Sequence, residues 1–89
     1  MEVTNIKEIL AKLKNELSYA LKGDEIIVDD VTFEEKGKYH FLTVTLDKIG
    51  GIDLETIVDA THIVNDIVDK MDITDDSYIL DVVSKERGN

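Results

Sequence analysis

Apolar residues recur every three or four positions in two separate stretches of the chain, residues 5–22 and residues 53–71. At 3.6 residues per turn, this spacing gathers apolar side chains on one face of a helix. The pattern therefore predicts two amphipathic helices. Their core-facing positions are Ile6, Ile9, Leu10, Leu13, Leu17 and Leu21 in the first, and Ile57, Val58, Ala60, Thr61, Val64, Ile67, Val68 and Met71 in the second.

Polar residues and a glycine predict where these helices begin and end. Asn5 and Glu8 have the spacing of a capping box, in which each side chain bonds an amide at the start of the helix. Gly23 is well placed to end the first helix in a left-handed conformation. Asp53 is expected to cap the second helix, because its carboxylate can accept a hydrogen bond from an amide two or three residues later.

Stretches rich in β-branched residues predict three strands, over residues 25–34, 39–47 and 78–84. The first two are joined by a short turn that contains Gly37, so they should form a hairpin. In the second strand, strict alternation places one set of apolar side chains on the same face, namely Leu42, Val44 and Leu46.

The first strand has a less regular pattern. We expect Ile27, Val31 and Phe33 to point mostly inward, but the pair Asp29–Asp30 interrupts the alternation. A β-bulge or an edge position would accommodate this pair, because a bulge inserts one extra residue and resets which side chains face the core.

The predicted order is helix, strand, strand, helix, strand. Two amphipathic helices and a small sheet with one apolar face bury those faces against each other. The 89 residues therefore predict a single domain of the α+β class, a two-layer sandwich with both helices on one face of a three-stranded sheet. The link from the second strand to the third through a helix should be a right-handed crossover if those strands are parallel.

Charge narrows the range of partners. The chain carries 20 acidic and 10 basic residues, a net charge of −10, and only three of the acidic residues precede Gly23. Such a surface repels phosphates, so direct recognition of nucleic acid is not expected, whereas basic partners are favoured. Without cysteine, a secretory signal or an apolar run of membrane-spanning length, the chain is expected to be cytoplasmic and without a membrane contact.

The chemistry-bearing residues do not form a recognisable catalytic or metal-binding motif. His40 and His62 have no second histidine at ligand spacing, and the aspartates of residues 69–76 lack the order of a calcium-binding loop. Gly50–Gly51 lacks the lysine and hydroxyl residue of a phosphate loop. We therefore expect no enzyme activity, no cofactor and no metal site.

Two sequence blocks resemble the N-terminal domain of the RimP family of ribosome maturation factors. That family shows an apolar strand ending in Asp, a turn, and a Gly-Ile-Asp-Leu-Glu type block that opens a helix. The matching residues here are Leu46, Asp47, Gly51, Ile52, Asp53, Leu54 and Glu55, and in the last strand Tyr78, Leu80, Val82 and Ser84, with Asp81 in place of Glu. The Pro-Gly that follows the serines in the family is absent, and "SKERGN" stands there instead.

The resemblance implies a non-catalytic module that binds the small ribosomal subunit, or a basic ribosomal protein, during subunit maturation. It covers nearly the whole chain but not the SH3-like barrel that follows in the family, so the chain is expected to be either a piece of a longer protein or a stand-alone paralogue. The alternative is an acidic protein-interaction or dimerisation domain unrelated to ribosomes. The oligomeric state stays open.

Acidic residues on or beside the second helix are the candidate partner-binding residues. The set comprises Asp53, Glu55, Asp59, Asp66 and Asp69. Their carboxylates could dock a basic surface through electrostatic complementarity. A solvated charged face is the alternative reading of the same residues, and for Asp53 the alternative is its role as a helix cap.

Overall fold

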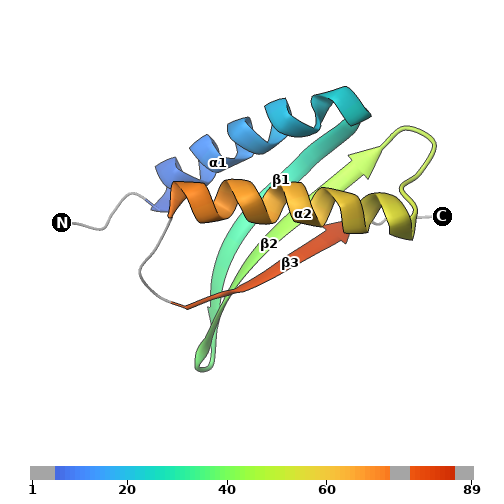
Figure 1. Cartoon of the computed structure of the whole chain (residues 1–89). Coiled ribbons are helices and arrows are strands. Elements are labelled where there is room, and N and C mark those ends of the chain that lie inside the picture. Colours follow the sequence, from blue (N-terminus) through green and yellow to red (C-terminus); the bar gives the residue numbers. More distant parts are fainter. Residues whose placement is uncertain (1–5, 73–76, 86–89) are drawn as a thin grey trace.

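Two helices lie side by side on one face of a three-stranded sheet in the computed structural model of the chain (Figure 1). The structure describes residues 6–72 and 77–85. The elements are α1 (Ile6–Leu21), the 3-10 turn η1 (Lys22–Asp24), β1 (Ile26–Lys36), β2 (Tyr39–Lys48), α2 (Leu54–Met71) and β3 (Ile79–Ser84). Their order confirms the predicted α+β class, with both helices on one face of the sheet.

Strand β2 is the centre of the sheet. It pairs antiparallel with β1 and parallel with β3, so the strand order is β1-β2-β3. A parallel neighbour cannot be reached by a tight turn, and α2 supplies the required crossover between β2 and β3. Helix α1 packs on β1 while α2 contacts α1 and β3, so the helix pair spans the width of the sheet.

The core lies between the helix layer and the sheet. Three alternate residues of β2 are fully buried, as predicted from their alternation: Leu42, Val44 and Leu46. The inner faces of the helices meet them with residues spaced three or four apart, which are Leu13, Leu17 and Leu21 of α1 and Ala60, Val64 and Val68 of α2. Burying each large side chain contributes about 1.5–3 kcal/mol, which makes this layer the main source of stability.

A β-bulge at Asp29 resets the side-chain alternation of β1. Val28 pairs with Leu46, but the next pairing joins Asp30 to Thr45, so Asp29 is the inserted residue. The bulge was one of the two outcomes expected from the Asp29–Asp30 pair. Its position contradicts the inward orientation expected for Ile27, which is 50% exposed, while Ile26 and Val28 on either side are buried.

The chain leaves α1 in a different way from that predicted. Gly23 lies within η1 and does not have a positive φ; the left-handed residue is Glu25, with φ of 63°. The helix tightens into a 3-10 turn before it stops, and the Glu25 amide donates to the Lys22 carbonyl at 2.9 Å. The capping box expected at the start of α1 involves Asn5, which lies outside the described residues.

Replacing Glu25 with glycine should stabilise the domain. The left-handed conformation costs a residue with a side chain about 1–2 kcal/mol, and glycine avoids this cost. Part of the gain is offset because glycine loses more backbone entropy when the chain folds. We expect Glu25→Gly to raise the free energy of unfolding in urea by about 1 kcal/mol.

Gly23→Ala is the matched control for this prediction. Its added Cβ would meet no heavy atom within 4 Å, so the variant should keep or slightly exceed the stability of the parent. A marked loss in Gly23→Ala together with no gain in Glu25→Gly would place the left-handed residue at Gly23 instead.

Candidate acidic docking surface

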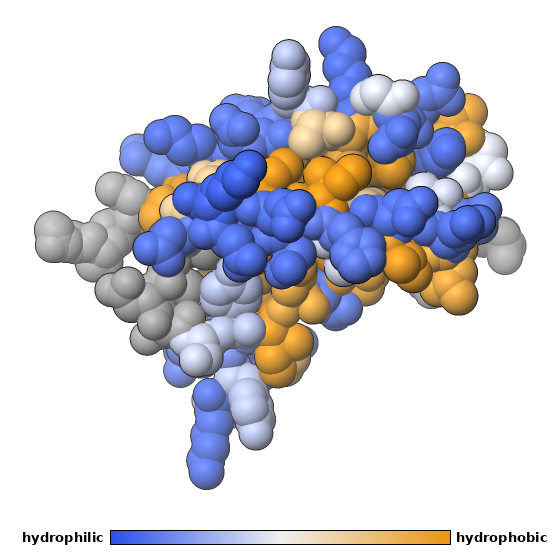
Figure 2. All heavy atoms as spheres, viewed as in Figure 1, coloured by the Kyte–Doolittle hydropathy of each residue, from blue (hydrophilic) through white to orange (hydrophobic). Residues whose placement is uncertain are grey.

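The outer face of α2 presents a row of carboxylates along one side of the helix. Four acidic residues on it are exposed and spaced four, seven and three residues apart; together we call them the acidic stripe, namely Glu55, Asp59, Asp66 and Asp69. At 100° per residue, these four side chains fall within an arc of about 80°. Figure 2 shows hydrophilic residues forming a band along α2 across the front of the molecule. The structure thus brings four of the five predicted site residues onto one face.

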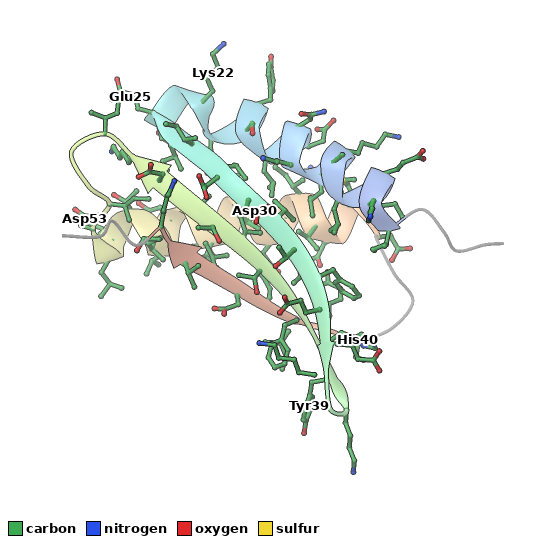
Figure 3. All side chains as sticks on the ribbon, turned by 180° about the vertical axis from the view of Figure 1, so that it is seen from behind. Lys22, Glu25, Asp30, Tyr39, His40 and Asp53 are labelled. Carbon is green, nitrogen blue, oxygen red and sulfur yellow. The ribbon has the colours of Figure 1, made fainter. Side chains whose placement is uncertain are left out.

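Asp53, the fifth predicted residue, caps α2. Its Oδ1 atom accepts a hydrogen bond from the Thr56 amide at 2.8 Å (Asp53 is labelled in Figure 3). Hydrogen bonds from the Thr56 side chain and amide, with the nearby positive charge of Lys48, hold the pKa of Asp53 below its usual range. One carboxylate oxygen is therefore engaged in starting the helix, although the residue is exposed at the end of the acidic stripe.

Two exposed apolar residues flank the start of the acidic stripe. Leu54 is 78% exposed and Val58 is 48% exposed, and they lie one turn apart on α2. Val58 was expected to face the core with the rest of the helix stripe, and that expectation is wrong. Leu54 falls outside the three- and four-residue spacing of the core-facing side chains of α2. This mismatch was the feature of the sequence that indicated an outward-pointing Leu54. The surface therefore combines carboxylates with apolar side chains.

At the other end of α2, the acidic residues lie near an aromatic cluster. Burial raises the pKa of Tyr78, and the negative charges of Asp69 and Asp72 raise it further. The Tyr78 ring meets the Phe33 ring edge-on, with 6.3 Å between the ring centroids. The His40 ring stacks on Phe33 with a centroid distance of 5.4 Å. His40 is therefore a packing residue at the hairpin end of the sheet, whereas His62 is exposed between the stripe carboxylates.

The hollows of the surface offer little for catalysis. One hollow of about 610 Å³ lies between the end of α1 and β1 and is lined mainly by Ile26, Ile27, Val28 and Ile49, with Lys22 and Glu25 at its margin. Ser18 also lines it, but no histidine does, so nothing there would activate the hydroxyl. Across residues 6–72 and 77–85, no three or more His, Cys or acidic side chains are grouped to hold a metal ion.

The fold and this surface together define a class: a small α+β domain that presents a charged helix face flanked by exposed apolar side chains. The sequence model of the RimP N-terminal domain matches residues 6–85, which include every described helix and strand. The chain therefore belongs to the RimP N-terminal domain family, the family of a ribosome maturation factor. The resemblance seen in the Gly-Ile-Asp-Leu-Glu block is confirmed. In the described part of the chain, no helix is both long and apolar enough to span a bilayer.

The cap at Asp53 predicts a defined pH dependence of stability. Because the folded state lowers the pKa of this carboxyl below 3.8, its stabilising effect is present above that pH and is lost as the pH falls through the lower, folded-state value. Thermal unfolding of Asp53→Ala should occur several degrees below the parent at pH 7, and the difference should shrink at pH 3 and below.

Asp53→Asn provides the control, because asparagine caps helices about as well as aspartate but does not titrate. It should retain most of the parent's melting temperature at pH 7. If Asp53→Ala melted with the parent at pH 7, the carboxylate would not be stabilising α2.

Proposed function

We propose that this domain is a non-catalytic ribosome maturation module that docks on the small ribosomal subunit, or on a basic ribosomal protein, through the acidic stripe of α2. The observation that carries the proposal is the family membership over residues 6–85, which directs attention to a ribosomal partner. The stripe provides a surface suited to a basic protein. In this proposal the domain works in the cytoplasm, where subunits mature.

Electrostatics favours a protein partner over rRNA. The net charge of −10 repels a phosphate backbone and attracts a basic protein surface. Four carboxylates in one arc focus that attraction on one face of the domain, so encounter with a basic protein should be fast and should weaken as salt rises. Each exposed ion pair contributes only about 0–1 kcal/mol, so the stripe acts through several charges together.

The apolar pair beside the stripe supports a docking role for the same surface. Protein interfaces combine an apolar centre with a charged rim, and charges alone define orientation more than affinity. Leu54 and Val58 supply exposed apolar area next to Glu55 and Asp59. A basic partner that covered both would bury this area while pairing its charges with the stripe.

Charge reversal within the stripe tests the proposal. The triple variant Asp59→Lys, Asp66→Lys, Asp69→Lys should reduce co-sedimentation with purified small subunits at low ionic strength by roughly tenfold or more. The substitutions are on exposed positions of a capped helix, so circular dichroism should show an unchanged helix content.

A second triple variant, Glu8→Lys, Glu16→Lys, Glu35→Lys, has the same net charge but places the reversals on α1 and the hairpin. It should sediment with subunits much as the parent does. Equal loss in both variants would show that only total charge matters, and no loss in the stripe variant would remove α2 from the docking surface. Failure of the parent itself to bind subunits, with capture of another protein instead, would favour an interaction domain unrelated to ribosomes.

A further inference from the structure

The sheet has a second face that no helix covers. Seen from behind, the three strands lie in front of both helices, and Asp30 stands near the middle of this face (Figure 3). We call it the open face. It is distinct from the acidic stripe, because α2 and its outer surface lie on the opposite side of the molecule (Figures 1 and 3).

Carboxylates on the open face follow the register of the strands. Successive rows across the sheet carry one each, alternately on the two border strands: Asp30 on β1, Asp81 on β3 and Glu34 on β1. All three side chains are exposed. Their neighbours on β2 are two residues apart along that strand, namely Thr45, Thr43 and Phe41. Two residues of a strand span about 6.8 Å, so the acidic rows repeat at that interval.

Apolar side chains lie between these carboxylates. Val83 shares the row of Asp30, and Ile79 shares the row of Glu34 and is 46% exposed. Two cations near this face are engaged in ion pairs: Lys85 pairs with Asp29 at 3.2 Å, and Lys36 lies 3.6 Å from Glu34. Asp30 and Asp81, on the two border strands, therefore set the negative character of the face, and Asp30 keeps one oxygen available because its Oδ1 accepts from the Val31 amide at 2.9 Å.

We propose that the open face is a second docking surface, one that takes an extended basic polypeptide with a cationic residue at every second position. This inference rests on the proposed function, since it assumes the same basic class of partner. An extended chain running along the strands presents same-side residues about every 6.8 Å, the interval of the acidic rows. Laid over β2, the chain would extend successive cations alternately toward β1 and β3, where they would meet Asp30 and Asp81. Their aliphatic stems would cover Val83 and Ile79.

Charge complementarity selects this occupant over others. A second copy of the domain would bring its own carboxylates against Asp30 and Asp81, and an RNA strand would bring phosphates; both are repelled. A basic globular surface could match the charge but would not match the regular interval between the rows. A strand-like basic segment satisfies both the charge and the spacing.

A designed peptide pair tests the proposal. The probe is a capped decapeptide of alternating lysine and valine, titrated at low ionic strength into the ¹⁵N-labelled 89-residue chain. We expect the amide resonances of Thr43, Thr45 and Asp81 to shift. The control peptide has the same ten residues arranged as a block of lysines followed by a block of valines, and it should bind more weakly because its charges do not match the rows.

Neutralising the central carboxylates should weaken binding of the alternating peptide. Asp30→Asn with Asp81→Asn is expected to raise its dissociation constant roughly tenfold. Glu8→Gln with Glu16→Gln removes equal charge from α1 and should leave the constant within about twofold of the parent. Both double variants replace exposed residues and are checked for an unchanged amide spectrum away from the substitutions.

Three results would overturn the proposal: shifts confined to α2, equal affinity for the two peptides, or full binding by the Asp30→Asn, Asp81→Asn variant. None of them would contradict docking through the acidic stripe, which is tested separately by sedimentation of its own reversal variant. If instead the alternating peptide binds the open face while the stripe variant still sediments with subunits, the second surface stands and the proposed role of α2 falls.

Discussion

The packing of both helices on the central strand β2 is the constraint on which the rest of the structure depends. Leu42, Val44 and Leu46 have no exposed surface, and they form the floor for the inner faces of α1 and α2. Because β3 is parallel to β2, the chain must cross the sheet between them, and α2 is that crossing. The same packing that buries one side of α2 fixes the direction in which its opposite side points.

This arrangement keeps charged residues out of the core: in the described part of the chain, no polar or charged side chain is buried. Every described carboxylate is therefore at least partly in contact with water. With a net charge of −10, the chain places many carboxylates close together on a small surface. One group follows the outer face of α2, and another follows the strands of the uncovered sheet. Each inherits its spacing from the backbone element that carries it.

Periodicity alone was enough to predict most of this fold, because both helices and β2 bury one face against a single core. The cap at Asp53 was also predictable, since it depends only on local hydrogen bonding. The orientation of Ile27 was not, because a single inserted residue at Asp29 reverses the pattern on one side of it. The prediction that Gly23 ends α1 in a left-handed conformation was also wrong. The chain tightens into a 3-10 turn after α1, and the left-handed residue is Glu25. For the docking surface, the sequence identified the carboxylates of α2 but not the exposure of Val58, which lies on the margin of the apolar stripe, away from the buried Ala60, Val64 and Val68.

The bulge at Asp29 also bears on how the protein avoids polymerising. Strand β1 lies at the border of the sheet and is 11 residues long, and a flat border of that length is a template for fibrillar stacking of one chain on another. An inserted residue twists the strand locally and breaks the regular sequence of backbone donors and acceptors. Adjacent aspartates at the same point add mutual repulsion between approaching chains. The irregularity that disturbs the sequence pattern thus disfavours regular pairing of this border with a strand of another copy.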